Sequence, residues 1–240
     1  MTALLPLPKD DVHVWQARVD ADSLRECELL GALSSDERAR SYRFHFRKDR
    51  DLYLVGRSMM RALLGGYVGC QPSEVPLCYS AHGKPGLSPD VQTDLQFNLS
   101  HSRELALFAV TRGSPIGVDV EFVQPTVMNE RVAEEFFSSY EVAALRALPA
   151  ELKSQGFFNC WTRKEAFIKA KGEGLSMKLD QFDVTLQPGH PAKLLSIRPD
   201  PKEADHWSLR DLPLSGGYIG AVAVGRRDFH LRSYDWPGNS

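Results

Sequence analysis

Three strand-like segments follow one another between residues 95 and 123, and they limit the possible fold more than any other feature of the chain. The segments are LQFNLSHS, LALFAVTR and IGVDVEFV, with Gly113-Ser114-Pro115 between the last two. Each is short, apolar or alternating, and bounded by turn residues, which is the pattern of neighbouring β-strands. We therefore expect a three-stranded antiparallel unit in the middle of the chain.

Segments with helical periodicity lie on both sides of these strands. Ser34-Ser35-Asp36-Glu37 has the pattern of a helix N-cap. In DLYLVGRSMMRALLGGYVG, apolar residues recur every three or four positions until Gly65-Gly66. We expect further helices at about 129 to 148 and in FFNCWTRKEAFIKAKGEGL. Further strands are expected in VHVWQARV, QFDVTLQPG, AKLLSIRP, HWSLRDL and GGYIGAVAVGRR. The pattern predicts a mixed α/β fold of the α+β kind.

Composition is that of an ordinary globular protein and excludes several classes. With 240 residues, 42% of them hydrophobic, and a formal net charge of -2, the chain has no overall field for nucleic acid or an anionic membrane. A local basic cluster lies between Arg38 and Arg61. The four cysteines form no CxxC pair, no histidine spacing fits zinc, and no apolar run approaches the ~18 residues of a membrane-spanning helix. We expect a cytoplasmic protein with reduced thiols.

The segment IGVDVEFV carries two carboxylates on one face. The two-residue period of a strand places Asp119 and Glu121 together, opposite Val118 and Val120. Two neighbouring carboxylates are costly when both are ionised, so either this face is open to water or a cation lies there. Mg²⁺ commonly takes one or two carboxylates together with phosphate oxygens and water. Zinc is less suitable, because no His or Cys accompanies the pair.

The helix predicted in FFNCWTRKEAFIKAKGEGL adds two charged side chains at helical spacing. Glu165 and Lys169 are four positions apart, and an exposed pair of this kind contributes only about 0.2–0.5 kcal/mol to a helix. A solvated charged face is one explanation. In the other, Glu165 completes an acidic trio with Asp119 and Glu121. Lys169 then neutralises phosphate, and Gly172 caps the helix.

The segments FNLSHS and HGKPGL contain polar side chains with two explanations each. Ser100 and His101 are adjacent on a strand and point to opposite faces, which argues against a Ser–His catalytic pair. His101 is either a phosphate contact or an ordinary strand-end histidine. Lys84 and the backbone amides of its loop could face an anion, although Gly-Lys-Pro is also common turn chemistry.

The ordered set GKPGL, FNLSHS, GVDVE and WTRKEAFIKAKGEGL resembles the 4′-phosphopantetheinyl transferases of the surfactin-synthetase (Sfp) type. The segments SSDERARSYRFHFRKDRDLYLVGRSMMR and GGYIGAVAVG extend the likeness over most of the chain. The resemblance implies an α+β fold of two similar, pseudo-symmetric halves, each a small, mostly antiparallel sheet packed with helices, with the active site in the cleft between them. The first half is 1–115, with the basic region and the GKP and NLSHS motifs. The second is 116–240, with the metal and catalytic motifs.

The resemblance also implies a reaction and the residues that perform it. The 4′-phosphopantetheine group of coenzyme A moves to a serine of an apo acyl or peptidyl carrier protein, and 3′,5′-ADP is released. Asp119, Glu121 and Glu165 match the family's Mg²⁺ ligands. Glu165 also matches its proposed base, acting directly or through water, and Lys169 matches the catalytic lysine near the diphosphate. The implied coenzyme A contacts are Arg40 at the 3′-phosphate, Lys84, Ser100, His101, Asp119 and Lys169.

The likeness leaves some positions open. A second basic residue of some family members falls on Glu37, so we expect Arg38 or Arg43 to serve the 3′-phosphate instead. Glu141 matches a further acidic position without a clear role. In FVQPTVMNERVAEEFF, the residues Val127 and Met128, beside Arg131, are candidates for a carrier-protein surface. In the alternative, Phe136 and Phe137 belong to the core and the rest of this segment is a loop.

Two other functions compete with transfer. One is a Mg²⁺-dependent coenzyme A or nucleotide hydrolase, although the chain has no GxxxxGK[ST] loop and no GxSxG motif. The other is a non-enzymatic partner of carrier proteins, which the acidic trio and Lys169 argue against. We expect a monomer that serves fatty acid, polyketide or non-ribosomal peptide biosynthesis, and the sequence does not distinguish among these carriers.

Overall fold

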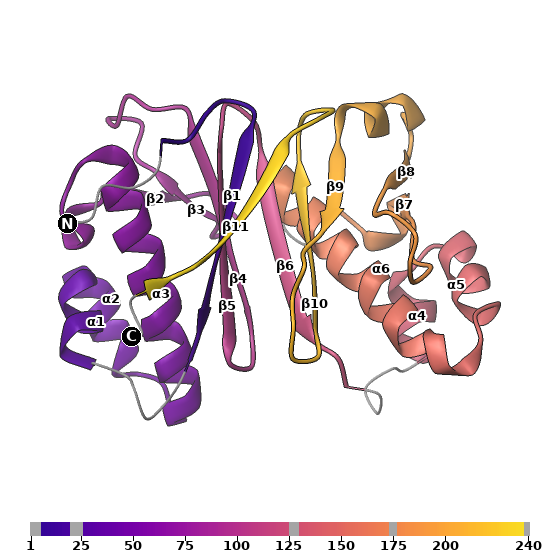
Figure 1. Cartoon of the computed structure of the whole chain (residues 1–240), viewed down its shortest axis with the longest axis horizontal. Helices are drawn as coiled ribbons and strands as arrows, with labels where there is room; N and C mark the ends of the chain where they lie inside the picture. Colours follow the sequence, from indigo (N-terminus) through magenta and orange to yellow (C-terminus); the bar gives the residue numbers. More distant parts are fainter. Residues whose placement is uncertain (1–5, 20–25, 125–129, 173–176, 238–240) are drawn as a thin grey trace. The chain divides into compact units, whose positions relative to one another are not determined.

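The computed structural model describes residues 6–19, 26–124, 130–172 and 177–237 (Figure 1). Contacts divide the chain into two compact units. The first unit extends to Gly113 and also contains the residues from His230 onwards, and the second unit runs from Ser114 to Phe229. The predicted halves, 1–115 and 116–240, differ from these units chiefly in the assignment of the residues after Phe229.

The first unit is built on a four-stranded sheet with the order β11-β1-β5-β4. Its strands are β1 (Asp11–Arg18), β4 (Leu95–Ser102), β5 (Leu105–Arg112) and β11 (His230–Asp235). β5 is antiparallel to both of its neighbours, whereas β11 lies parallel to β1 at the edge of the sheet. A separate antiparallel hairpin contains β2 (Leu77–Tyr79) and β3 (Pro85–Leu87).

One long helix supplies more of the core of the first unit than any other element. The helical elements are α1 (Glu26–Ala32), α2 (Ser35–Ser41), α3 (Arg47–Val68) and the 3-10 turn η1 (Pro72–Glu74). The buried face of α3, including Leu54, Met59 and Leu63, belongs to one apolar cluster with Phe97 of β4 and Phe108 of β5. The predicted N-cap before α2 is confirmed, because the Ser34 side chain accepts a hydrogen bond from Glu37 N.

The predicted end of α3 at Gly65-Gly66 is wrong. The helix continues to Val68 and ends at Gly69, whose φ of 76° is the left-handed conformation of a C-cap. Gly65 is needed inside the helix because the chain folds back over it. A Cβ at Gly65 would lie 2.7 Å from the Cys70 carbonyl oxygen.

The second unit has a three-stranded antiparallel sheet with the order β6-β10-β9 and a two-stranded sheet of β7 and β8. The strands are β6 (Ile116–Phe122), β7 (Phe182–Val184), β8 (Leu194–Ile197), β9 (Ser208–Asp211) and β10 (Tyr218–Val224). The helical elements are α4 (Glu130–Phe136), α5 (Ser139–Arg146), α6 (Ala150–Lys171), η3 (Leu179–Gln181) and η4 (Pro201–His206).

The helix α6 lies against the three-stranded sheet and forms the centre of the second core (Figure 1). Ala166, Phe167 and Ala170 of α6 are buried in the same apolar cluster as Ala221 and Ala223 of β10. The helix ends as predicted at Gly172, which has a φ of 75° and donates its N–H to the Ile168 carbonyl oxygen. The loop predicted beyond it lies, at 173–176, outside the described residues.

Two further expectations are corrected. β4 and β5 pair as predicted, but β6 pairs with β10 of the second unit, because β1 occupies the other edge of β5. The single helix expected at 129 to 148 is two helices, α4 and α5. The break occurs because Ser138 has an extended backbone and caps α5, accepting a hydrogen bond from Glu141 N.

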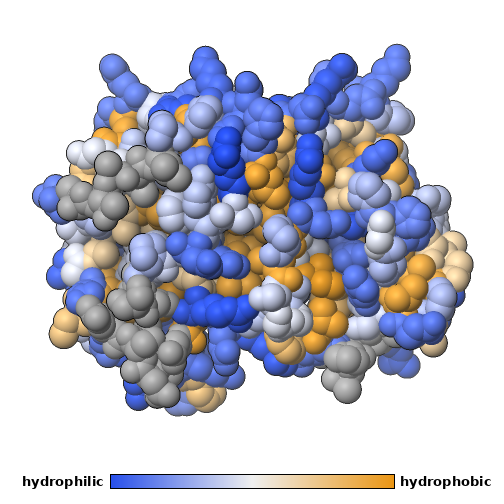
Figure 2. Space-filling view, viewed as in Figure 1, coloured by the Kyte–Doolittle hydropathy of each residue, from blue (hydrophilic) through white to orange (hydrophobic). Residues whose placement is uncertain are grey.

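The surface carries hydrophilic and apolar side chains side by side on the face shown in Figure 2. Within the described ranges, no helix combines the length and the apolar character that crossing a membrane requires.

Candidate active site

One strand and one helix of the second unit bring the predicted acidic residues and the lysine together. Asp119 and Glu121 lie two positions apart on β6, so both side chains leave the same face of the strand. Glu165 and Lys169 lie about one turn apart on α6. The Lys169 ammonium is 2.5 Å from Asp119 Oδ1, to which it donates a hydrogen bond. The acidic face of β6 is therefore the face that α6 covers.

Gly117 sets the separation between the strand and the helix. It lies on the same face of β6 as Asp119, two positions earlier. A Cβ added to Gly117 would lie 2.1 Å from the Ala166 carbonyl oxygen and 2.4 Å from the Ala170 nitrogen. The two backbones are in direct contact, which glycine allows because it has no side chain. This contact holds the turn of α6 that carries the predicted base close to the strand carboxylates.

The electrostatics of the site centre on Glu165. Burial raises the pKa of Glu165 above its usual range, and the Asp119 and Glu121 carboxylates raise it further, while the Lys169 ammonium opposes them. Asp119 is itself almost fully buried, with 3% of its surface exposed. A cation near these three carboxylates would favour their ionised forms.

The chemistry of the donors suits a magnesium ion. Among the described side chains, no group of three or more His, Cys, Asp or Glu residues is arranged to hold a metal by itself. Mg²⁺ needs no such group, because it is usually held by one or two carboxylates and completes its shell with water and phosphate oxygens. Asp119 with one neighbouring carboxylate meets that requirement. The Lys169 ammonium forms an ion pair with Asp119, so a bound metal would compete with this ammonium for the Asp119 carboxylate.

Lys164, which precedes Glu165, has a structural role that the sequence did not suggest. Its ammonium is 2.8 Å from the Glu141 carboxylate, and both side chains are completely buried. The ammonium also donates to the carbonyl oxygens of Leu179 and Phe182, at 2.7 and 2.6 Å. These contacts fix α6 to α5 and to the start of β7. Lys164 therefore places a buried ion pair within the core of the second unit.

Glu141, whose family role is unclear, is structural here, because its carboxylate accepts two backbone N–H groups besides pairing with Lys164. One carboxylate oxygen accepts the Ser138 N–H at 3.0 Å and completes the capping box of α5. The other accepts the Val184 N–H at 2.8 Å. The spacing Ser-x-x-Glu was a signal for this cap, and the contact with Lys164 had none.

In the first unit, Lys84 lies at the end of the turn between β2 and β3. The Ser80 Oγ accepts hydrogen bonds from the Lys84 and His82 N–H groups, and the Ser80 carbonyl oxygen accepts one from Gly83. These backbone amides serve the turn itself, contrary to the expectation that they face an anion. Burial lowers the pKa of the Lys84 ammonium to about 8. The lysine side chain remains the candidate contact.

Ser100 and His101 lie on opposite faces of β4, as predicted. β4 continues to Ser102, so the strand does not end between them, and they pair with Leu107 and Ala106 of β5. Ser100 is buried and His101 is exposed. The geometry agrees with the prediction that they do not form a catalytic pair.

The basic cluster lies on α2, on the segment that follows it and on α3. Arg40 and Arg43 are exposed, and the Arg40 guanidinium is 5.7 Å from the centroid of the Tyr53 ring. Arg38 Nε donates to the Leu33 carbonyl oxygen at 3.1 Å. All three arginines are exposed, and the Arg38 guanidinium already supports the start of its own helix.

Glu37, the position that departs from the family pattern, is structural. It is buried, its carboxylate contacts Arg61 of α3, and Arg57 lies 3.7 Å away. The same carboxylate accepts the Ser34 N–H in the capping box of α2. This position holds helices together and does not offer a cation to a ligand.

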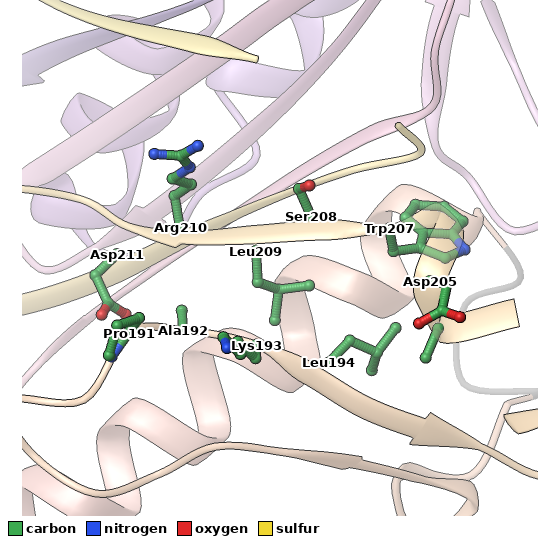
Figure 3. Close-up of a pocket in the computed structure, with 11 residues that line it drawn as sticks. Pro191, Ala192, Lys193, Leu194, Asp205, Trp207, Ser208, Leu209, Arg210 and Asp211 are labelled. Carbon is green, nitrogen blue, oxygen red and sulfur yellow. The ribbon is translucent and has the colours of Figure 1, made fainter. Parts of the chain in front are cut away.

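Two regions remain outside the predicted site. A pocket of about 490 Å³ in the second unit lies between β9 and the segment from Pro191 to Leu194 (Figure 3), and it contains none of the predicted residues. Val127 and Met128, the candidate carrier surface, lie outside the described residues. Phe137 is core as the alternative held, whereas Phe136 is 37% exposed.

Comparisons with known proteins agree on one family. A model of the 4′-phosphopantetheinyl transferase superfamily matches residues 115–223, and a model of the N-terminal part of 4′-phosphopantetheinyl transferases matches residues 23–112. The 4′-phosphopantetheinyl transferase HetI of Nostoc is 41% identical over 221 residues, which are 92% of this chain and 90% of HetI. Sfp of Bacillus subtilis, also a 4′-phosphopantetheinyl transferase, is 31% identical over 84% of this chain and 86% of its own length.

Proposed function

This chain belongs to the 4′-phosphopantetheinyl transferase superfamily, and we propose that it moves the 4′-phosphopantetheine group of coenzyme A to a serine of an apo acyl or peptidyl carrier protein. The products are the holo-carrier protein and 3′,5′-ADP. The observation that carries this proposal is the contact between Lys169 and Asp119 beside a half-buried Glu165, in a chain 41% identical to a transferase of this kind.

The second unit supplies the groups for the chemical step. Glu165 takes the proton of the carrier serine, directly or through a water molecule, as the serine oxygen attacks the phosphorus that bears pantetheine. A serine O–P bond forms, and the bond from that phosphorus to the oxygen of the 5′-phosphate breaks. Lys169 stabilises the negative charge that develops on the diphosphate oxygens, because positioning and electrostatic stabilisation dominate phosphoryl transfer.

Asp119, Glu121 and Glu165 are the proposed ligands of a magnesium ion. When bound, Mg²⁺ would neutralise charge on the diphosphate and supply the cation that these carboxylates favour. Asp119 is buried and shared with Lys169, so its carboxylate is fixed in direction before any ligand arrives.

Residues of the first unit are proposed to hold coenzyme A. Arg40 binds the 3′-phosphate, with Arg43 as the second cation, since both guanidinium groups are exposed. The Lys84 ammonium is proposed to contact a phosphate of coenzyme A. The backbone N–H of Lys84 is not needed for this contact, because it donates a hydrogen bond within the turn. Ser100 and His101 act as separate contacts from the two faces of β4.

Incubation with a panel of apo carrier proteins, coenzyme A and Mg²⁺ tests this function by mass spectrometry. The panel contains carriers from fatty acid, polyketide and non-ribosomal peptide synthesis. Transfer adds a phosphopantetheine group of about 340 Da to a carrier serine. Release of 3′,5′-ADP without any carrier adduct would instead identify a hydrolase, and no reaction with coenzyme A would overturn the proposal.

A further inference from the structure

Arg163, two residues before Glu165, is buried, and every N–H donor of its guanidinium has a hydrogen-bond acceptor. Only 1% of the side chain is exposed. Its Nε and Nη2 atoms donate to the two carboxylate oxygens of Asp211 at 2.9 and 2.7 Å. Nη1 donates to the carbonyl and hydroxyl oxygens of Thr185 at 2.6 and 3.1 Å, and Nη2 donates to the His190 carbonyl oxygen at 3.3 Å. These five hydrogen bonds match the five N–H donors of a guanidinium.

The partner of Arg163 lies in the same row of the sheet as the acidic site. Ala221 of β10 pairs with Asp211 of β9 on one side and with Asp119 of β6 on the other. Arg163 of α6 therefore binds one edge strand, and Lys169 of α6 binds the other edge strand at the same level. Two ion pairs tie the helix to the sheet on either side of Glu165 in the sequence.

The direction of Glu165 follows from its two predecessors. Successive side chains on an α-helix are about 100° apart, so Arg163, Lys164 and Glu165 leave α6 in three directions. Arg163 reaches β9 and the segment that contains Thr185. Lys164 reaches Glu141 and η3. Because the Arg163 and Lys164 side chains are both held by these contacts, rotation of α6 about its axis is restricted. The Glu165 side chain then points toward β6.

The Asp211 carboxylate is 45% exposed, unlike Arg163. Figure 3 shows Asp211 at one end of the pocket, with its side chain directed toward Pro191, and Trp207 at the other end. A substitution at Asp211 can therefore remove the ion pair without placing a new group in the apolar core.

We propose that Arg163, through Asp211, Thr185 and His190, is a positioning residue that fixes the rotation of α6 and so aims the Glu165 carboxylate at the metal and substrate site. The proposal rests on the proposed function, because that function assigns Glu165 its role. Arg163 itself touches no reacting atom. A lysine in its place would provide a point charge and could not keep both the two-pronged contact with Asp211 and the carbonyl contacts.

The test uses Asp211→Asn and Arg163→Lys in the full chain, with Mn²⁺ as the probe for the metal site. Residues that orient metal ligands typically contribute 10- to 100-fold to metal affinity or activity. We therefore expect the dissociation constant for Mn²⁺, measured with coenzyme A present, to rise about tenfold or more in both variants. We expect kcat to fall by a similar factor, while KM for coenzyme A changes by less than about twofold. Asp211→Glu, which keeps the carboxylate, should recover most of the loss.

Arg61→Lys is the matched control. Arg61 is also a buried arginine on a long helix, with a carboxylate partner, Glu37, and carbonyl acceptors in the loop after the helix. We expect Arg61→Lys to lower the melting temperature as much as Arg163→Lys and to leave Mn²⁺ affinity unchanged. Equal loss of thermal stability in all of these variants, with Mn²⁺ affinity unchanged in each, would overturn the positioning role.

A double-mutant comparison separates loss of positioning from a general loss of folding. In a Glu165→Ala background the orientation of position 165 no longer matters, so Asp211→Asn should have no further effect on Mn²⁺ affinity. If the two changes are instead additive, Asp211 and Arg163 do not act through Glu165, and the proposal fails. Because Mn²⁺ binding needs no carrier protein, the positioning role can hold in a chain that transfers no phosphopantetheine, and it can fail in one that does.

Discussion

The two units share a frame around a long helix, but the proposed catalytic residues lie on that helix in only one of them. α3 and α6 each contain 22 residues and each bury a cation. In the first unit, Glu37 of a capping box pairs with Arg61 of α3, and in the second, Glu141 of a capping box pairs with Lys164 of α6. Lys164 is followed by Glu165, whereas Arg61 is followed by Ala62.

The difference also appears in how the candidate residues are supported. In the first unit they come from α2, from the turn after β2 and from β4, and the cations among them sit at exposed or loop positions. In the second unit they come from one strand and one helix whose backbones touch at Gly117. We infer that a shared frame stabilises both units, and that catalysis needs the additional direct contact because reacting groups tolerate little displacement.

The largest expected effect on transfer comes from Gly117→Ala. The new Cβ would lie 2.1 Å from a backbone oxygen of α6, which no side-chain rotation can relieve. Overpacking of this kind typically costs about 1–3 kcal/mol and occasionally more, so we expect unfolding midpoints to fall sharply and transfer to be lost. In the first unit, Gly56→Ala is the control, since its Cβ would lie 3.6 Å from Leu99 Cδ2. Unfolding by guanidinium chloride should show a larger loss of unfolding free energy for Gly117→Ala than for Gly56→Ala. Equal losses would show that the close contact between β6 and α6 is not needed.

Lys164 and Lys169 lie five positions apart on α6. We expect substitution of the first to lower stability and substitution of the second to lower the transfer rate. Lys164→Met leaves the buried Glu141 carboxylate without its cation, which typically costs about 3–5 kcal/mol of unfolding free energy. Lys169→Met removes a partly exposed ammonium and should lower kcat far more than stability. Denaturant unfolding and initial transfer rates for both variants provide the check. A stable Lys164→Met protein would show that the frame does not depend on this pair.

Lys84 gives the first unit a pH dependence. Its pKa is lowered to about 8, so the ammonium is charged below that pH and loses its charge as the pH rises through it. If this charge binds coenzyme A, KM for coenzyme A should rise severalfold between pH 7 and pH 9. Lys84→Arg should remove the rise, because a guanidinium stays charged throughout this range. A KM profile identical in wild type and Lys84→Arg would exclude the ammonium as the contact.

The smallest expected effect concerns the two capping boxes. Ser34→Ala and Ser138→Ala each remove one side-chain cap, at a cost of about 1 kcal/mol. Both variants should transfer phosphopantetheine at near-normal rates below their melting temperatures. Melting temperatures and transfer rates at 25 °C, measured for both variants, provide the check. A large loss of kcat in only one variant would indicate that its serine has a catalytic role.

Local patterns were visible in the sequence because they depend on neighbours in the chain. The two-residue period of IGVDVEFV placed Asp119 and Glu121 together, the spacing of Glu165 and Lys169 placed them on one side of a helix, and the motifs named the family that the comparisons confirm. The cap at Ser34 was predicted for the same reason.

What the sequence could not provide are contacts between distant segments. Arg163 and Asp211 are 48 positions apart, and nothing in either segment indicates that they meet. The partner of β6 was misassigned because pairing with β10 depends on which strand edge is occupied. The helix expected at 129 to 148 was broken by a Ser-x-x-Glu cap that apolar periodicity obscures. Gly117 could be read as a strand residue, but its contact with α6 required the fold.

We propose that Glu165 acts with the β6 carboxylates in the transfer of phosphopantetheine. Single-turnover mass spectrometry of an apo carrier protein with Glu165→Gln tests it most directly, since this substitution keeps the size of the side chain and removes its charge and basicity. We predict a folded protein that binds coenzyme A and forms no carrier adduct above background. A Glu165→Gln protein that modifies the carrier at the wild-type rate would show that the Glu165 carboxylate is not needed for transfer.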